Sequence, residues 1–188
     1  TSSLLMTYAT HQPRTPAFVF PTTRDNSPTP LTELELQKWK RVLERMDRIS
    51  LQCQSHNVSL LIDAEHSWVQ PAIDLLAMYQ ALQYNLRVPS GERPLIHNTY
   101  QLYLKDGLER LKFDYEFLMS MNDKSSDNTG GSITGENVQN VQSWKVKHGV
   151  KLVRGAYMQS ESKRCETVKN PYPFNRDIQS THDMYHSA

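Results

Sequence analysis

Three short runs with the character of β-strands, separated by longer helical patterns, limit the folds open to this chain. They lie at residues 58–64, 94–101 and 149–154. The first run is almost continuously apolar and follows a turn signal, which is typical of a strand buried on both faces of a parallel sheet. We therefore predict an α/β fold with three strands.

Amphipathic helices are predicted between and beyond these strands. Apolar residues recur at helical spacing over residues 32–57, 69–82 and 102–121, and another helix begins near Asp177. Thr32 is a suitable N-cap for the first of these helices. Strands that alternate with helices imply βαβ units, parallel strands and right-handed crossovers.

The number of strands falls short of a complete α/β barrel. A barrel of eight strands needs about 250 residues, whereas this chain has 188 residues. Periodicity alone does not separate part of a barrel from a small doubly wound sheet, so both architectures stay open at this point.

Two segments are too polar to join a compact core. Residues 1–30 contain 15 Ser, Thr or Pro, and residues 123–140 consist mostly of small polar residues. Such stretches bury little apolar surface to offset chain entropy. We expect a flexible N-terminal segment, one folded domain over residues 31–188, and a disordered surface insertion within it. Because the chain begins with Thr1 rather than Met, we also expect its natural N-terminus to lie upstream.

Composition argues against several classes of function. The formal net charge is +1, which gives no support for a nucleic-acid partner. No run of about 18 apolar residues occurs, so no membrane-spanning helix is expected. Cys53 and Cys165 do not form a Cys-x-x-Cys pair, and we predict two reduced thiols rather than a zinc or redox site.

Polar residues accompany the end of each predicted strand. Asp63 and Glu65 follow the first strand, Gln101 ends the second, and Lys151 and Arg154 lie in the third. Ligands of parallel α/β folds bind at the carboxyl ends of the strands, so these residues form a candidate site. The alternative is that they cap helices and pair with one another, because any α/β fold has polar strand ends.

Three longer motifs surround these polar residues. They are Ile62-Asp63-Ala64-Glu65, which is followed by Gln70-Pro71-Ala72-Ile73; Pro94-Leu95-Ile96-His97-Asn98-Thr99-Tyr100-Gln101-Leu102-Tyr103-Leu104-Lys105-Asp106; and Lys151-Leu152-Val153-Arg154-Gly155-Ala156-Tyr157. All three resemble motifs of eukaryotic members of the proline dehydrogenase family. Long motifs in the right order and on matching predicted strands are far more specific than one short pattern.

The resemblance implies part of a (β/α)8 TIM barrel of the proline dehydrogenase type, with FAD as cofactor. The family oxidises L-proline to 1-pyrroline-5-carboxylate by hydride transfer to the flavin and passes the electrons to a quinone, which is the first step of proline catabolism to glutamate. The resemblance also implies a mitochondrial location, with peripheral association on the matrix side of the inner membrane.

The resemblance assigns roles to individual residues. Asp63 and Lys151 are expected to be catalytic, with Asp63 on the substrate side and Lys151 as a cation that tunes the flavin. Tyr157 is expected to wall the proline pocket, and no metal is expected. The residues expected to bind the cofactor are Ala64, Gln101, Lys151, Val153, Arg154, Gly155 and Ala156.

Parts of the family's site have no counterpart in this sequence. The arginines that bind the substrate carboxylate belong near the end of the family's barrel, and a substrate-side lysine belongs to an earlier strand. We therefore expect this internal fragment to have weak or no activity alone. The polar insertion indicates a fungal-like sequence.

Two other functions stay open at this stage. A metal-assisted hydrolase on an α/β barrel would use Asp63, Glu65 and His97, although their spacing fits no helical metal motif. A catalytically inactive, truncated scaffold is the second alternative.

Several other side chains fit purely structural roles. Tyr100 and Tyr103 are predicted to pack in the core. The charged residues Glu161, Lys163 and Arg164 are predicted to form a solvated helix face.

Overall fold

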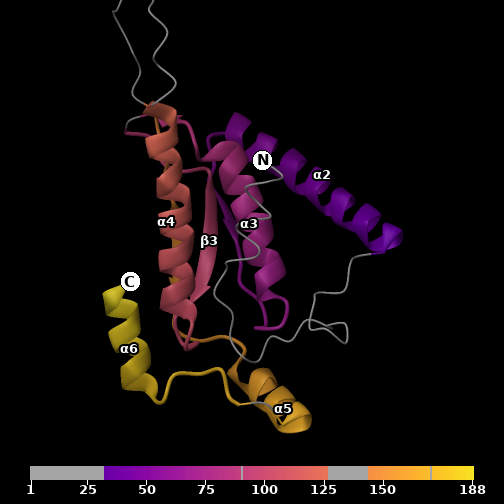
Figure 1. The fold of residues 1–188 in the computed structure, drawn as a ribbon, viewed down its shortest axis with the longest axis vertical. Coiled ribbons are helices and arrows are strands. Elements are labelled where there is room, and N and C mark those ends of the chain that lie inside the picture. Colours follow the sequence, from indigo (N-terminus) through magenta and orange to yellow (C-terminus); the bar gives the residue numbers. More distant parts are fainter. Residues whose placement is uncertain (1–31, 90, 127–143, 170) are drawn as a thin grey trace, which may run out of the picture.

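The computed structural model describes residues 32–89, 91–126, 144–169 and 171–188. The segment expected to be flexible, residues 1–30, lies outside the described residues, and so do residues 127–140 of the expected insertion. The described chain forms helices packed against a small sheet, with the C-terminal helices near one end of its strands (Figure 1).

A three-stranded parallel sheet forms the centre of the fold. Its strands are β1 (Leu60–Ile62), β3 (Ile96–Gln101) and β5 (Gly149–Val153), in the order β1-β3-β5. β1 pairs with the first half of β3, and β5 pairs with β3 as far as Gln101. The prediction of three parallel strands is confirmed, and the carboxyl ends of β3 and β5 lie level with each other.

Helices α2 (Glu33–Ser55) and α3 (Gln70–Tyr84) begin where the sequence predicts. Thr32 caps α2 through a capping box, in which the Thr32 amide donates to the Glu35 carboxylate at 2.8 Å. Pro71 lies in the first turn of α3, where its missing N–H costs no helical hydrogen bond. α3 connects β1 to β3 and packs on β3.

Helix α4 (Gly107–Ser126) differs from its predicted range at both ends. It begins later than residue 102 because a turn follows β3, and a side chain at position 107 would collide with the carbonyl oxygen of Gln101. It also continues through Ser126, so residues 123–126 of the expected insertion are helical. A formed helix gains one hydrogen bond with each added residue and therefore extends into polar sequence.

Two short strands lie outside the predicted elements. β2 (Val88–Pro89) pairs antiparallel with β4 (Trp144–Lys145), although the sequence predicts a loop at residues 86–93. Two-residue strands carry too little periodicity to be found from sequence. Helices α5 (Met158–Val168) and α6 (Ile178–Ser187) follow β5, and the Asp177 carboxylate caps α6 by accepting from the Ser180 amide at 2.8 Å.

Among the described residues, helices cover one face of the three-stranded sheet and no helix covers the other. Asn98 donates to Asp74 of α3 at 3.0 Å, and Tyr100 donates to Asp114 of α4 at 2.6 Å, so both helices cover the same face. Because side chains alternate along a strand, Thr99 and Gln101 point to the other face. We call this other side the helix-free face.

The apolar core lies between the sheet and helices α3 and α4. Ile62, Ala77 and Ile96 form one buried cluster. A second cluster consists of Met78, Ala81, Leu82, Leu118 and Val146. Among the residues that the structure describes, no helix is both long enough and apolar enough to cross a membrane.

Candidate active site

Two predicted site residues, Asp63 and Lys151, meet on the helix-free face together with Thr99, which the sequence did not single out. The Lys151 ammonium on β5 pairs with the carboxylate of Asp63, just beyond β1, and the Thr99 hydroxyl on β3 lies 3.4 Å from the same carboxylate. The hydrogen bond from Lys151 lowers the pKa of Asp63. Since 72% of the Asp63 side chain is exposed, this charged pair is open to a ligand.

Gln101 lies at the end of β3 with its carboxamide fixed in one orientation. Its Nε2 donates to the backbone carbonyl of Glu65 at 2.8 Å and to the Tyr103 hydroxyl at 2.9 Å. Because a backbone carbonyl can only accept, the nitrogen must face Glu65. The oxygen, Oε1, is buried and has no hydrogen-bond partner among the described residues.

The segment after β5 offers an accessible stretch of backbone beside this site. Val153 is half-buried, whereas Gly155 and Ala156 are exposed. No atom lies within 4 Å of the position that a Cβ at Gly155 would occupy, so a ligand can approach the backbone there. By contrast, Ala64 is buried at 8% exposure and offers little surface of its own.

The Arg154 side chain is held by α6 rather than by the other predicted site residues. Its Nη1 lies 3.2 Å from Nδ1 of His182, and its guanidinium carbon lies 4.7 Å from the centre of the Tyr185 ring. Any contact of Arg154 with a ligand on the helix-free face would therefore use its backbone or require these interactions to break.

Tyr157 closes one side of the candidate site. Its ring lies 4.3 Å from the ring of His66, between centres, and its amide donates to the Tyr103 hydroxyl at 3.4 Å. A hydrogen bond to Glu65 raises the pKa of Tyr157, so its hydroxyl stays protonated at neutral pH. Tyr100 and Tyr103 are fully buried and pack as predicted, and the Tyr103 hydroxyl also contacts the site.

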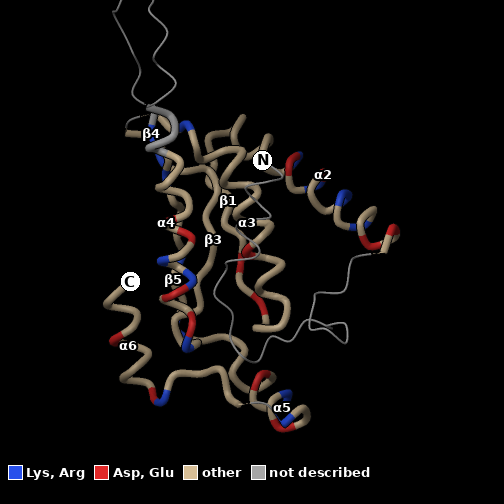
Figure 2. Tube along the Cα trace, viewed as in Figure 1, with Lys and Arg blue, Asp and Glu red and all other residues tan. Residues whose placement is uncertain are grey.

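The prediction of a solvated helix face at residues 161–164 is wrong for Glu161. Acidic and basic residues both occur along α5 (Figure 2), but Glu161 turns inward and is only 2% exposed. Its carboxylate accepts from the Ser67 amide at 2.5 Å and the Ser67 hydroxyl at 2.9 Å. Lys163 and Arg164 are exposed as predicted, and the guanidinium carbon of Arg164 lies 4.5 Å from the centre of the Trp68 ring. These contacts fasten α5 to the segment that follows β1.

A buried polar network behind the site is absent from the sequence-based prediction. Asp74 accepts from Gln70 at 2.8 Å, from Asn98 at 3.0 Å and from Arg110 at 3.1 Å. Gln70 in turn accepts from the Glu65 amide at 2.8 Å. The related signal in the sequence is the four-residue spacing of Gln70 and Asp74, which places them on one side of α3, but polarity alone would assign that side to solvent.

The arrangement expected for a metal-assisted hydrolase is not formed. Among residues 32–126 and 144–188, apart from the two undescribed positions, no three His, Cys, Asp or Glu side chains gather closely enough to hold a metal ion. His97 lies two residues before Thr99 on β3, and burial lowers its pKa. Cys53 and Cys165 are both free thiols.

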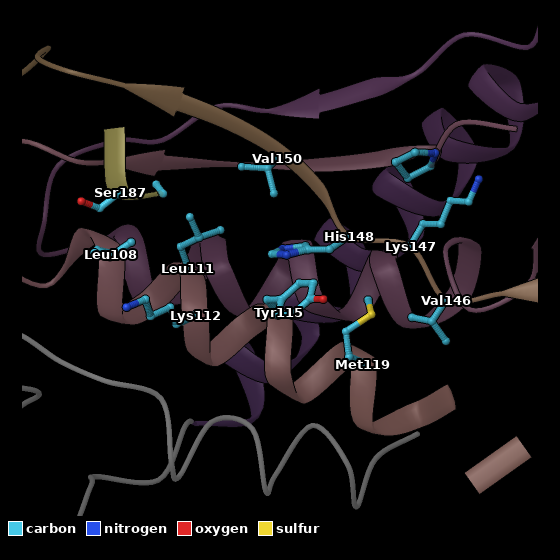
Figure 3. Close-up of a pocket in the computed structure, with 12 residues that line it drawn as sticks. Leu108, Leu111, Lys112, Tyr115, Met119, Val146, Lys147, His148, Val150 and Ser187 are labelled. Atoms are coloured by element: carbon cyan, nitrogen blue, oxygen red, sulfur yellow. The ribbon is translucent and has the colours of Figure 1, made fainter. Parts of the chain in front are cut away.

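One cavity of the described chain lies away from all of these groups. It has a volume of about 590 Å³ and lies between α4 and β5, as Figure 3 shows. Leu111, Tyr115, Met119, His148 and Val150 supply much of its wall. It contains none of the predicted site residues, so its size does not make it the candidate active site.

Comparison with known proteins connects this geometry to one family. The family model described as proline dehydrogenase matches residues 4–188. The chain is 37% identical to proline dehydrogenase 2, mitochondrial, of Arabidopsis thaliana, over 87% of this chain and 29% of that protein. It is 35% identical to proline dehydrogenase 1, mitochondrial, of Dictyostelium discoideum, over 84% and 23% of the two chains. The chain thus spans less than a third of either relative.

Solved structures agree on the fold. The chain matches the crystal structure of proline utilization A from Bdellovibrio bacteriovorus, a protein that was inactivated by N-propargylglycine. The TM-score is 0.57 and the identity 17%, over 79% of this chain and 13% of that one. The protein of the same name from Bradyrhizobium japonicum gives a TM-score of 0.53 and 17% identity, over 78% and 12%. The sheet and its helices are therefore part of a (β/α)8 barrel. Since the family model covers nearly the whole sequence, the chain belongs to the proline dehydrogenase family.

Proposed function

We propose that this chain supplies part of the active site of an FAD-dependent proline dehydrogenase. The reaction would oxidise L-proline to 1-pyrroline-5-carboxylate, with electrons passed to a quinone, as the first step of proline catabolism to glutamate. The observation that carries this proposal is the grouping of Asp63, just beyond β1, with Gln101 at the end of β3 and Lys151 on β5 of a proline dehydrogenase barrel.

The residues at the strand ends fit a flavin. The buried Oε1 of Gln101 has no partner in the described part of the chain, although such groups normally find one, and a bound ring could supply it. The open space beside Gly155 would admit a flat ligand close to the backbone. Gln101, Lys151 and the backbone of residues 153–156 would hold the cofactor, with Ala64 beside it. When bound, FAD would supply the hydride acceptor.

Asp63 and Lys151 would provide the charges of the site. Because Lys151 lowers the pKa of Asp63, the carboxylate is ionised at neutral pH and can accept a hydrogen bond from the substrate amine. The Lys151 ammonium would favour negative charge that develops on a neighbouring ring. The exposed Asp63–Lys151 pair can exchange partners when a ligand enters, since little desolvation opposes the change.

Tyr157 would wall the substrate pocket. A tilted ring contact with His66 and the anchored α5 hold its ring in place. Because its hydroxyl stays protonated at neutral pH, Tyr157 acts in this proposal as a shape-determining group rather than as a base.

The proposed location has support from the names of two relatives. The Arabidopsis and Dictyostelium relatives are named as mitochondrial. These names support a mitochondrial location for this protein. The quinone acceptor and the peripheral association with the matrix side of the inner membrane are proposed from the resemblance of the motifs alone. A fungal-like source stays a prediction from the polar insertion.

The proposal is tested by purifying the full-length protein and recording its absorbance and its proline-dependent reduction of a quinone analogue. We expect bound flavin, turnover with L-proline, and turnover about tenfold slower in Gln101→Ala, the effect of one hydrogen bond of about 1.4 kcal/mol. A protein that carries no flavin, or that is not reduced by proline, would overturn the proposal. The 188-residue chain alone is expected to show weak or no turnover.

A further inference from the structure

A continuous chain of hydrogen bonds runs from a buried ion pair to the candidate site. It begins at Arg110, which donates to Asp74, and passes through Gln70 to the backbone of Glu65. Glu65 is held from both sides, because its amide donates to Gln70 and its carbonyl accepts from Gln101. Gln70 is fully buried, so water does not compete for these bonds.

The chemistry of each partner fixes the direction of this chain. A carboxylate paired with a guanidinium offers only acceptors, so the amide nitrogen of Gln70 must face Asp74. The oxygen of Gln70 then faces the Glu65 amide, which can only donate. At the far end, the Glu65 carbonyl requires the nitrogen of Gln101. The oxygen of Gln101 is therefore not used in this chain of hydrogen bonds, and it has no hydrogen-bond partner among the described residues.

We propose that Gln70 is a positioning residue, which holds Glu65 so that Gln101 presents its carboxamide oxygen to a hydrogen-bond donor on the bound ligand. This inference rests on the proposed function, under which the donor is a ring N–H of the flavin. It adds a residue on the helix-covered side of the sheet to a site that lies on the opposite side.

Helix α3 contains a matched control. Gln80 is also fully buried and also joins two side chains, since it accepts from Ser50 at 2.7 Å and donates to Asp47 at 2.9 Å. Those partners belong to α2 and have no link to Glu65 or Gln101. Substitution of either glutamine by Met removes the same amide from the same helix, but only Gln70→Met interrupts the path to the site.

The test compares the dissociation constant of FAD and the visible spectrum of the bound flavin in wild-type full-length protein, Gln70→Met and Gln80→Met. We expect comparable losses of thermal stability in the two variants. Only Gln70→Met should weaken FAD binding, roughly fivefold for one displaced hydrogen bond, and shift the flavin spectrum. Equal FAD affinity in Gln70→Met and wild type would overturn the inference, as would equal weakening in both variants.

A second variant decides the question if Gln70→Met does not fold. In Gln70→Glu, a protonated Glu can accept from the Glu65 amide and donate to Asp74, as the glutamine does, whereas an ionised Glu repels Asp74. Burial beside a second carboxylate favours the protonated form. The FAD affinity of Gln70→Glu should therefore rise toward the wild-type value as the pH falls. If FAD affinity depends on pH in the same way in Gln70→Glu and in the wild type, the inference is contradicted.

Failure of this inference is distinct from failure of the proposed function. If the wild-type protein binds no FAD, the proposed function fails and the inference fails with it. If the wild-type protein binds FAD and Gln70→Met binds it equally well, only the role of Gln70 is lost.

Discussion

Two ion pairs on opposite sides of one sheet have different surroundings. The Asp63–Lys151 pair lies on the helix-free face, with 72% and 37% of the two side chains exposed. The Asp74–Arg110 pair lies under the helices, with 1% and 4% exposed. Burial lowers the pKa of Arg110, but the carboxylates of Asp74 and Asp106 more than offset this and the net change is upward.

The difference separates charge used for binding from charge used for structure. An exposed pair contributes little to stability because water and salt screen it, and for the same reason its members can change partners. Removing one member of a buried pair lowers the free energy of unfolding strongly, because the other charge stays buried without water or a partner. We therefore expect substitutions in the first pair to affect ligands and substitutions in the second to affect folding.

The largest effect is expected for Asp74→Ala. The change leaves the guanidinium of Arg110 without its closest acceptor and interrupts the bonds from Gln70 and Asn98. We expect the free energy of unfolding to fall by about 3–5 kcal/mol, measured by denaturant unfolding. A loss below about 1 kcal/mol would show that the buried Asp74–Arg110 pair contributes little to the stability of the fold.

A smaller effect is expected from pH on the helix-covered side. Burial lowers the pKa of His148 to about 4, from an ordinary value of 6.5, and its Nε2 lies 2.8 Å from the Tyr100 hydroxyl. The unfolded chain takes up a proton at higher pH than the folded one. The contribution of neutral His148 to the free energy of unfolding is thus fully present above pH 6.5, and about 3 kcal/mol is lost as the pH falls to about 4.

The control for this pH dependence is His148→Leu, which removes the titrating group. Denaturation midpoints measured across the same pH range should decline less steeply in the variant than in the wild type. Parallel declines in the two proteins would assign the acid sensitivity to other groups.

The smallest effect on stability is expected for Asp63→Ala. We expect a change of less than about 1 kcal/mol in the free energy of unfolding, together with a clear loss of proline-dependent flavin reduction. The same substitution at Asp74 is the matched comparison. If both substitutions destabilise the protein equally, the division between the two faces of the sheet does not hold.

The sequence predicts the elements whose pattern is local. The run at residues 58–64 indicates a strand, and the capping signal at Thr32 and the proline at position 71 locate helix starts, all of which the structure confirms. The prediction that this strand is buried on both faces is wrong, because β1 covers only Leu60–Ile62 and Leu61 is 50% exposed. The polar strand ends also indicate the site, because parallel strands bring their carboxyl ends together. The structure accordingly joins Asp63 to Lys151, 88 residues further along the chain.

What the sequence does not predict depends on distant partners. Nothing near Glu161 in the chain indicates that its carboxylate is buried, because its partner Ser67 lies 94 residues earlier. Pro89 argues against a strand, yet its pairing with Trp144 is possible in a strand with a single neighbour. Gln70 and Asp74 would be assigned to the solvent side of α3 by polarity alone, and their burial depends on Asn98 and Arg110.

The most direct test of the central claim is chemical acetylation of lysines with and without FAD, with modification at each lysine measured by mass spectrometry. If the strand ends bind the flavin, FAD should protect Lys151 while Lys145, which is exposed on β4, reacts equally in both samples. Equal modification of Lys151 with and without bound FAD would contradict a flavin site on the helix-free face.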